Sequence, residues 1–301
     1  MRLSHWLQLL GHPYALLLYT VTFWSGNMVI GRAFRDAIPP IQLATARWVV
    51  ALFLCLPFAL PHWRNHWPRI KAAWPLFTLL GLLGVGGYNT FAYLALQSTS
   101  AINAALLNTF IPIATMLLAT LLVGEKLTAR QGAGIALAAI GALVVITHGE
   151  PQQLLALTFN RGDLWMVMAV LSWALYTVLL RRRSPGVDPL VQLTFFIVVG
   201  LVILLPFAGW ERFVTEQRVQ VSWSVLLAIL YTGIFPGFLG YIFYNAAVAK
   251  VGAGVGSLFL YAMPVLTALL SLLFLEEAPH LYHLVGLVLV FAGIGVTLRR
   301  S

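Results

Sequence analysis

Long apolar runs alternate with short polar segments along the whole chain. Ten of these runs are long enough to cross a membrane, since a helical span needs roughly 20 predominantly apolar residues. The pattern therefore predicts an all-α integral membrane protein. Its transmembrane helices are expected over Pro13–Arg32, Ile41–Leu60, Trp74–Gln97, Ala101–Val123, Gln131–Thr147, Asp163–Leu180, Pro189–Ala208, Trp223–Val248, Ala253–Leu275 and Leu281–Leu298.

The second half of the sequence repeats the first. The fourth span carries Pro112 near its start and matches the ninth span, with Pro264, at an offset of 152 residues. The first two spans of each half match at an offset of 149, which pairs Trp24 with Trp173. A three-residue insertion in one loop accounts for the difference between the two offsets. The order and number of these matches indicate an internal duplication.

Each copy of the duplication holds an odd number of spans, so the second copy enters the membrane upside down relative to the first. Folds of this kind are typical of transporters, which bind their substrate between the two copies. We therefore expect two inverted five-helix repeats around a central cavity, and we place the repeats at residues 1–148 and 149–301.

The composition supports a membrane protein and excludes several other classes. Of the 301 residues, 60% are hydrophobic and 9% are charged, whereas about a quarter of a soluble domain is charged. The formal net charge of +9 comes from Lys and Arg scattered through short loops, so we expect no nucleic-acid partner. A single cysteine, Cys55, excludes an intrachain disulfide. The histidines, cysteine and acids show no metal-ligand spacing, and we expect neither a metal nor another cofactor.

The distribution of basic residues predicts the orientation. If the N-terminus is cytoplasmic, the 18 Lys and Arg divide into twelve on the cytoplasmic side, Arg47 within the second span, and five on the opposite side. This asymmetry places both termini in the cytoplasm. Short loops without a glycosylation sequon fit a multi-pass protein of the bacterial inner membrane. Glycine-rich seams in spans five and ten are explained by packing within a monomer.

Two tryptophans stand out by their depth. Eight of the ten lie near predicted helix ends, where indoles belong to the interfacial belt. Only Trp24 and Trp173 lie near mid-span, and they form the repeat-related pair. They either wall a substrate cavity or pack helices together. Neutral polar and aromatic residues at similar depth present the same choice between a cavity lining and interhelical hydrogen bonds: Asn27, Tyr88, Asn89, Tyr93, Asn103, Asn108, Tyr176, Tyr241, Tyr244, Asn245 and Tyr261.

Charged groups are nearly absent from mid-span positions. No Asp or Glu lies in the middle of a span, which disfavours cationic drugs and coupling through a central carboxylate. Arg47 is the one charge well inside a span. It could meet a substrate carboxylate, or it could snorkel to the interface or serve a structural partner. Prolines and a glycine in or near the cavity helices are candidate hinges, with static kinks as the alternative: Pro112, Pro236, Gly237 and Pro264.

These motifs resemble the ten-helix branch of the drug/metabolite transporter superfamily, which has two EamA-type repeats. The resemblance covers nearly the whole chain. It rests on Trp24 to Asn27, Pro112 to Lys126, Gly162-Asp163, Trp173-Ala174-Leu175-Tyr176 and Pro264 to Glu277. The second repeat has Glu276-Glu277 where the family usually has Gly-Glu, so that motif is imperfect.

Within the superfamily the chain is most similar to bacterial exporters of aromatic and other neutral amino acids. The resemblance implies alternating access around a central cavity and no catalytic residues. The cavity residues it implies are Trp24, Asn27, Tyr88, Asn108, Trp173, Tyr176, Tyr244 and Tyr261. The alternatives are an exporter of another small metabolite or drug in the same superfamily, or an integral-membrane enzyme. The enzyme would need interior acids, bases or nucleophiles that the spans lack.

Overall fold

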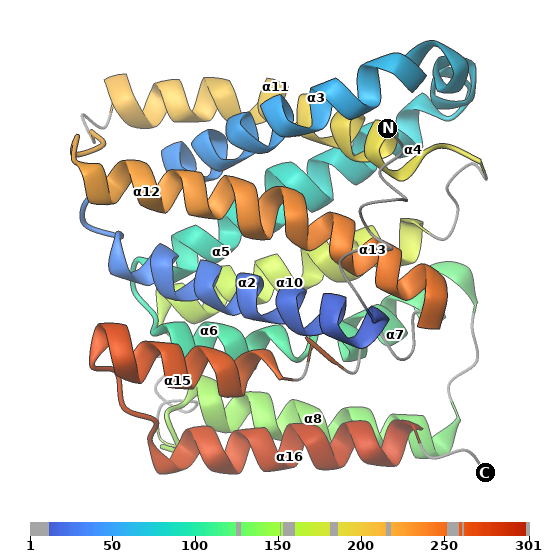
Figure 1. Ribbon diagram of the computed structural model, residues 1–301. Coiled ribbons are helices and arrows are strands. Elements are labelled where there is room, and N and C mark those ends of the chain that lie inside the picture. The colour runs from blue at the N-terminus through green and yellow to red at the C-terminus, as the bar shows by residue number, and fades with distance from the viewer. Residues whose placement is uncertain are drawn as a thin grey trace.

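A computed structural model describes residues 12–124, 128–150, 152, 160–180, 186–214, 218–251, 259–260 and 262–298. Helices account for the regular structure of these residues and lie side by side as a bundle (Figure 1). They are α2 (Pro13–Ala33), α3 (Pro40–Ala72), α4 (Trp74–Gly81), η1 (Leu82–Gly87), α5 (Tyr88–Leu96), α6 (Ala101–Asn108), α7 (Ile111–Val123), α8 (Ala129–Ile146), α10 (Arg161–Leu180), α11 (Pro189–Phe213), α12 (Trp223–Thr232), η2 (Gly233–Leu239), α13 (Gly240–Val251), α15 (Met263–Leu275) and α16 (Leu281–Leu298).

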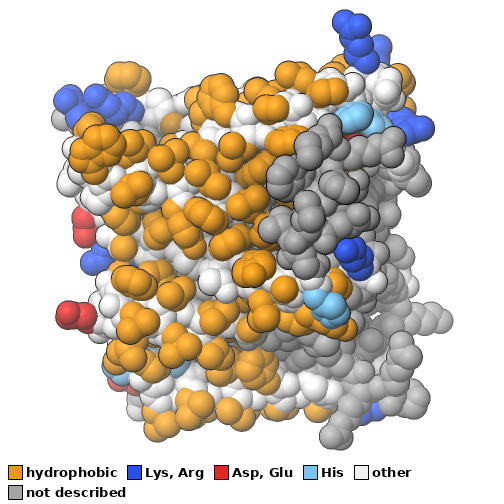
Figure 2. Space-filling view, in the orientation of Figure 1, with side chains coloured by type: hydrophobic (Ala, Val, Ile, Leu, Met, Phe, Trp, Pro, Cys, Tyr) orange, Lys and Arg blue, Asp and Glu red, His pale blue; other side chains and the backbone are white. Residues whose placement is uncertain are grey.

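The apolar lengths confirm the predicted all-α membrane fold. Six helical segments of the described chain are long and apolar enough to cross a bilayer, and three shorter apolar helices fall in spans five, nine and ten. Together with α2 they match the ten predicted spans. Figure 2 shows hydrophobic side chains across the middle of one face and charged side chains gathered at its two ends. Helix α2 starts and α16 ends at the same end of the bundle (Figure 1).

Helix α3 is longer than the apolar pattern predicts. The predicted span ends at Leu60, whereas the helix continues to Ala72 through Pro61 and Pro68. Each interior proline removes one backbone hydrogen bond. The carbonyls that Pro61 and Pro68 free belong to Pro57 and Arg64. Both residues are exposed, so neither carbonyl is buried among other helices. Leu60 therefore ends the apolar run but not the helix.

Pro112 and Pro264 begin helices instead of kinking them. The predicted fourth span is broken, because α6 ends at Asn108 and α7 begins at Ile111. Both prolines occupy the second position of their helix, α7 and α15. At that position the missing N–H has no intrahelical partner to lose. These prolines therefore lie at helix starts, and a hinge role for them, with a static kink as the alternative, stays a prediction.

Two π-helical turns interrupt spans three and eight at equivalent places. Adding 152 to the bounds of η1 gives 234–239, which lies within η2. A π-turn loosens the i→i−4 ladder, and such turns are frequent at functional sites. Pro236 and Gly237 both lie within η2. The duplication therefore reproduces a local backbone irregularity as well as the apolar pattern.

Packing across the two halves follows the same offsets. Gly81 lies so close to α11 that a Cβ there would be 3.0 Å from the carbonyl oxygen of Phe196. Gly233 lies equally close to α3, where a Cβ would be 2.9 Å from the carbonyl oxygen of Arg47. Arg47 and Phe196 are themselves 149 residues apart. In each half a glycine thus packs closely against the second span of the other half. The boundary between the repeats at 148–149 stays a prediction.

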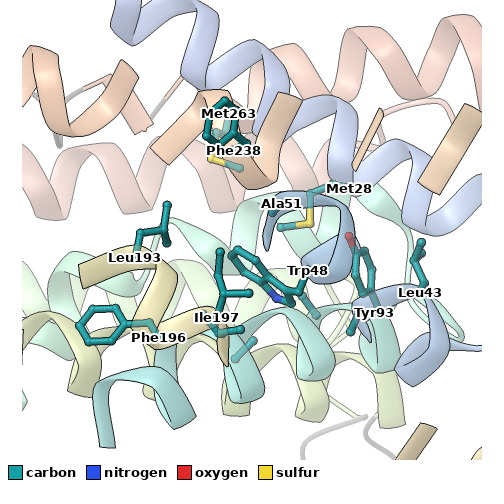
Figure 3. Close-up of a cluster of buried hydrophobic side chains, with 14 of the residues drawn as sticks. Met28, Leu43, Trp48, Ala51, Tyr93, Leu193, Phe196, Ile197, Phe238 and Met263 are labelled. Atoms are coloured by element: carbon teal, nitrogen blue, oxygen red, sulfur yellow. The ribbon is translucent and has the colours of Figure 1, made fainter. Parts of the chain in front are cut away.

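The first half of α3 lies in the buried interior of the bundle. Figure 3 shows Trp48 among Met28, Ala51, Tyr93 and Ile197, which come from α2, α3, α5 and α11. Trp48 has no exposed surface, and Tyr93 is 1% exposed. The first half of α3 is therefore enclosed by protein, and this enclosure determines the environment of the neighbouring Arg47.

Candidate functional site

A small cavity lies between helices of the two halves. Its volume is about 50 Å³, which holds only a few water molecules. A solute the size of an amino acid therefore fits only when the surrounding helices move apart. The cavity is lined by Trp24, Asn27, Met28, Arg47, Tyr88, Asn89, Ala105, Asn108, Thr109, Ile111, Pro112, Trp173, Tyr241, Leu260 and Met263.

An aromatic cluster forms one wall. The indole rings of Trp24 and Trp173 meet edge to face, with centroids 6.4 Å apart, and Tyr241 lies 6.1 Å from each. Tyr88 packs against Trp173 at 4.9 Å. The Nε1–H of Trp24 donates to the carbonyl oxygen of Pro236 at 3.1 Å. Because that carbonyl lies in the π-turn η2, the irregular backbone fixes the orientation of the indole.

Two further predicted residues support this wall from behind. Tyr176 packs on Trp173 at 5.1 Å between ring centroids, and Tyr244 packs on Trp24 at 5.4 Å. Neither tyrosine lines the cavity. Tyr261 lies outside the described residues. The structure thus brings five of the eight predicted residues to the cavity itself: Trp24, Asn27, Tyr88, Asn108 and Trp173.

The opposite wall is polar and centres on Arg47. Its Nη1 donates to Asn27 Oδ1 at 3.2 Å, to Asn89 Oδ1 at 2.5 Å and to Tyr93 Oη at 3.0 Å. Tyr93 Oη donates in turn to Asn27 Oδ1 at 2.6 Å. Arg47 is 1% exposed, and its guanidinium also lies 4.9 Å from the ring centre of Trp48. These neutral partners hold a charged group at the cavity.

The snorkelling interpretation of Arg47 is therefore wrong. The residue lies two turns from the start of α3, close enough in sequence to reach the interface. The partners from α2 and α5 instead replace water around Nη1 inside the bundle. The structural-partner interpretation is confirmed by these contacts, and the same side chain lines the cavity. An interaction with a substrate carboxylate stays a prediction.

Asn108 connects the two halves of the chain at the helix break. It accepts a hydrogen bond from Tyr88 Oη at 3.0 Å, and its Nδ2 lies 3.9 Å from Met263 Sδ. Asn108 is the last residue of α6, directly before the break, and Met263 begins α15. The cavity-lining Asn108 therefore lies directly beside the break between α6 and α7.

Four residues complete the site beyond the predicted cavity set: Arg47, Asn89, Tyr93 and Tyr241. Their positions at membrane depth mark the last three as candidates, and the sequence leaves the role of Arg47 open. The spacing of Asn89 and Tyr93, four residues apart on one helical face, was the available signal. Asn245 was expected to face the bundle or water, and it is exposed.

An ionic contact connects helices at the end of the bundle where α2 finishes. Arg32 Nε donates to Glu277 Oε1 at 2.9 Å, and Glu277 Oε2 accepts from the N–H of Ala101 at 3.1 Å. Arg32 Nη1 also donates to the carbonyl oxygen of Leu96 at 3.2 Å. Burial raises the pKa of the Glu277 carboxyl, and the Ala101 N–H and the charge of Arg35 oppose this shift. We call this set of contacts the Glu277 closure.

Comparison with known proteins supplies the family context. The model of the EamA-like transporter family matches residues 12–147 and 160–299. The uncharacterized transporter YyaM of Bacillus subtilis is 33% identical over 222 residues, which cover 72% of this chain and 71% of that protein. An uncharacterized transporter of Archaeoglobus fulgidus is 25% identical and covers 95% of this chain and 97% of its own length. A protein crystal structure superposes with a TM-score of 0.64 at 22% identity, covering 94% and 96% of the two chains, which supports the fold.

Proposed function

The chain belongs to the EamA-like transporter family, and from that premise we propose that it exports neutral amino acids, aromatic ones foremost, by alternating access. One observation carries the proposal. The repeat-related Trp24 and Trp173 meet edge to face in one wall of a cavity that is also lined by neutral amide and phenol groups. An apolar cavity with a few converging polar groups is the usual form of a small-molecule site.

The lining suits a zwitterion with an apolar side chain. Indole and phenol rings offer apolar area to an aromatic side chain, and their faces attract an ammonium group. The amides of Asn27 and Asn108 can hydrogen-bond a polar head group. Because Arg47 is the charged residue among the lining side chains, the local field repels cations. This argues against the second candidate within the family, an exporter of cationic drugs.

Alternating access requires a cavity that opens to one side at a time. The Glu277 closure holds one end together, and the cavity is too small for a solute in this arrangement. The π-turns η1 and η2 and the helix break before Pro112 are backbone positions where the regular α-helical hydrogen-bond ladder is interrupted. We propose that these positions absorb the motion, with Pro236, Gly237 and Pro264 among the hinge residues.

The orientation belongs to the same proposal. The excess of Lys and Arg on the side of the termini supports cytoplasmic termini in a bacterial inner membrane. The Glu277 closure then lies on the outer side, and the cavity would load from the cytoplasm, as export requires. We further propose that a monomer suffices for transport, since both cavity walls come from one chain.

The test is solute flux in proteoliposomes. Labelled phenylalanine, tryptophan and threonine are offered with and without an imposed pH gradient. Saturable flux of the aromatic amino acids supports the proposal. Flux that ignores the gradient indicates a facilitator, and flux that follows it indicates a proton carrier. If no amino acid moves while the protein is folded and inserted, the substrate assignment is wrong, although the family remains.

A further inference from the structure

We propose that Arg47 binds the carboxylate of the solute, so that the site selects amino acids and other carboxylates against amines and amides of the same shape. This inference rests on the proposed function and names the group on which recognition depends. It begins from a buried positive charge. Arg47 is 1% exposed, and within the described part of the chain no carboxylate lies within ion-pair distance of its guanidinium.

A buried charge without a counter-ion is costly, because neutral partners replace only part of the lost hydration. Ionisable residues inside a membrane protein usually have a function such as binding a substrate or an ion. The three hydrogen bonds of Arg47 all involve Nη1 and neutral oxygens. An incoming carboxylate would supply the missing negative charge, and the binding energy of the solute would include relief of this cost.

The guanidinium has an edge left for a ligand. Its Nε–H makes no hydrogen bond, and the described contacts of the side chain leave Nη2 without one. Nε and Nη2 form one fork of the guanidinium, which matches the two oxygens of a carboxylate. Nη1 is held by Asn27, Asn89 and Tyr93, so the fork is pre-oriented. Nε is covered in the contracted cavity and becomes reachable when the helices separate.

The internal duplication provides a control for a purely structural role. At the position equivalent to Arg47 the second half has Phe196, and this residue packs against Gly81 as Arg47 packs against Gly233. The equivalent of Asn27 is Tyr176, whose ring meets Phe196 at 6.1 Å. The same helix packing is therefore built without any charge. The packing of the second span therefore does not require an arginine at this position. We assign the role of Arg47 to the cavity that it lines.

The cavity thus has two chemically different ends. The polar end, with Arg47 and Asn89, comes from the first half, and the aromatic end takes Trp24 and Tyr88 from the first half and Trp173 and Tyr241 from the second. A solute would place its carboxylate on the first and its apolar side chain on the second. A zwitterionic aromatic amino acid satisfies both ends at once, and its ammonium group can lie over an aromatic face.

The primary test uses the unmodified protein. Labelled phenylalanine is exchanged across proteoliposomes in the presence of phenylalaninamide, phenethylamine or 3-phenylpropionate. We expect 3-phenylpropionate to compete with phenylalanine. The amide and the amine should compete at least about tenfold less well, the usual effect of losing a hydrogen-bonded charge. Equal competition by phenylalaninamide or phenethylamine, or none by 3-phenylpropionate, would overturn the assignment of the carboxylate to Arg47.

Substitutions then locate the selectivity. Arg47→Gln should abolish the preference for carboxylates, and Arg47→Lys should keep part of it. Arg64→Gln, an exposed arginine of the same helix, should leave the preference unchanged. If Arg47→Gln keeps the wild-type preference, the inference is wrong. Should that variant fail to fold, the ranking of the three competitors on the wild-type protein still decides the matter.

A binding assay separates this inference from the proposed function. 3-Phenylpropionate is titrated against the purified protein while the unfolding temperature is followed, since a ligand of the folded state raises it. A rise in the wild type that is absent in Arg47→Gln supports a carboxylate site even if phenylalanine is not transported. Absence of any rise in the wild type contradicts the site, even if phenylalanine flux is found.

Discussion

Arg32 and Glu277 form an ion pair between the two halves of the chain, with Nε 2.9 Å from Oε1 and about a fifth of each side chain exposed. The other carboxylate oxygen holds the first N–H of α6 at Ala101. The side chains of Arg32 and Glu277 therefore connect the end of α2 with the end of α15 and the start of α6. Any opening of the bundle at this end has to separate these groups.

A charge-swap series tests the Glu277 closure. Arg32→Glu and Glu277→Arg each place two like charges together and should each lower the unfolding temperature in detergent. The double swap Arg32→Glu with Glu277→Arg should recover part of the loss, with a coupling of about 1 kcal/mol for a partly buried pair. The recovery is the discriminating result. If the effects of the two substitutions simply add, the ion pair contributes nothing and the closure depends on packing alone.

Packing between the halves depends on glycine at two repeat-related positions. Gly233→Ala would bring a Cβ within 2.9 Å of the Arg47 carbonyl oxygen, and Gly81→Ala would clash similarly with α11. We expect each substitution to cost about 1–3 kcal/mol of unfolding free energy. Gly209→Ala is the matched control, because no heavy atom lies within 4 Å of its added Cβ. If all three variants unfold in detergent with the same free energy as the wild type, the close helix contacts at Gly81 and Gly233 are contradicted.

Glu211 caps a helix of the other half. Its carboxylate accepts from the N–H of Gln42 at 2.9 Å and from that of Ile41 at 3.3 Å, in the first turn of α3. An acceptor and a negative charge at a helix N-terminus are both stabilising. Glu211→Ala should therefore cost about 1 kcal/mol. Asp36→Ala removes a side chain that is 87% exposed and should change the unfolding temperature little. Equal effects of the two substitutions would refute the cap.

The membrane helices could be predicted because their signal is local. An apolar run of span length has few alternatives to a membrane helix, and a duplicated pattern with an odd number of spans fixes the inversion. The pairing of Trp24 with Trp173 also followed from the duplication. What the pattern could not give was the course of the backbone inside a span. Pro112 indicated a disturbance without showing that a new helix starts there, and nothing indicated the two π-turns.

The environment of Arg47 could not be predicted from its own helix. Two turns from a helix start, an arginine can reach the interface, and this made snorkelling a reasonable expectation. Whether it does so depends on which helices surround α3. Asn27 and Asn89 are 20 and 42 residues away in sequence, and their contact with Arg47 arises only from the packing of α2 and α5 against α3. Sites built from several helices are predictable as candidate residues and not as contacts.

The central claim is that the solute binds in the cavity that Trp24 and Trp173 line, and the flux of labelled phenylalanine through a set of three tryptophan variants tests it most directly. Trp173→Ala removes a cavity wall. Trp165→Ala removes a tryptophan from the same helix that is 39% exposed and stacks on Phe91. At equal membrane insertion we expect Trp173→Ala to cut flux roughly tenfold or more, Trp173→Phe to retain part of it, and Trp165→Ala to match the wild type. Wild-type flux in Trp173→Ala would contradict the account and reduce the paired tryptophans to helix packing.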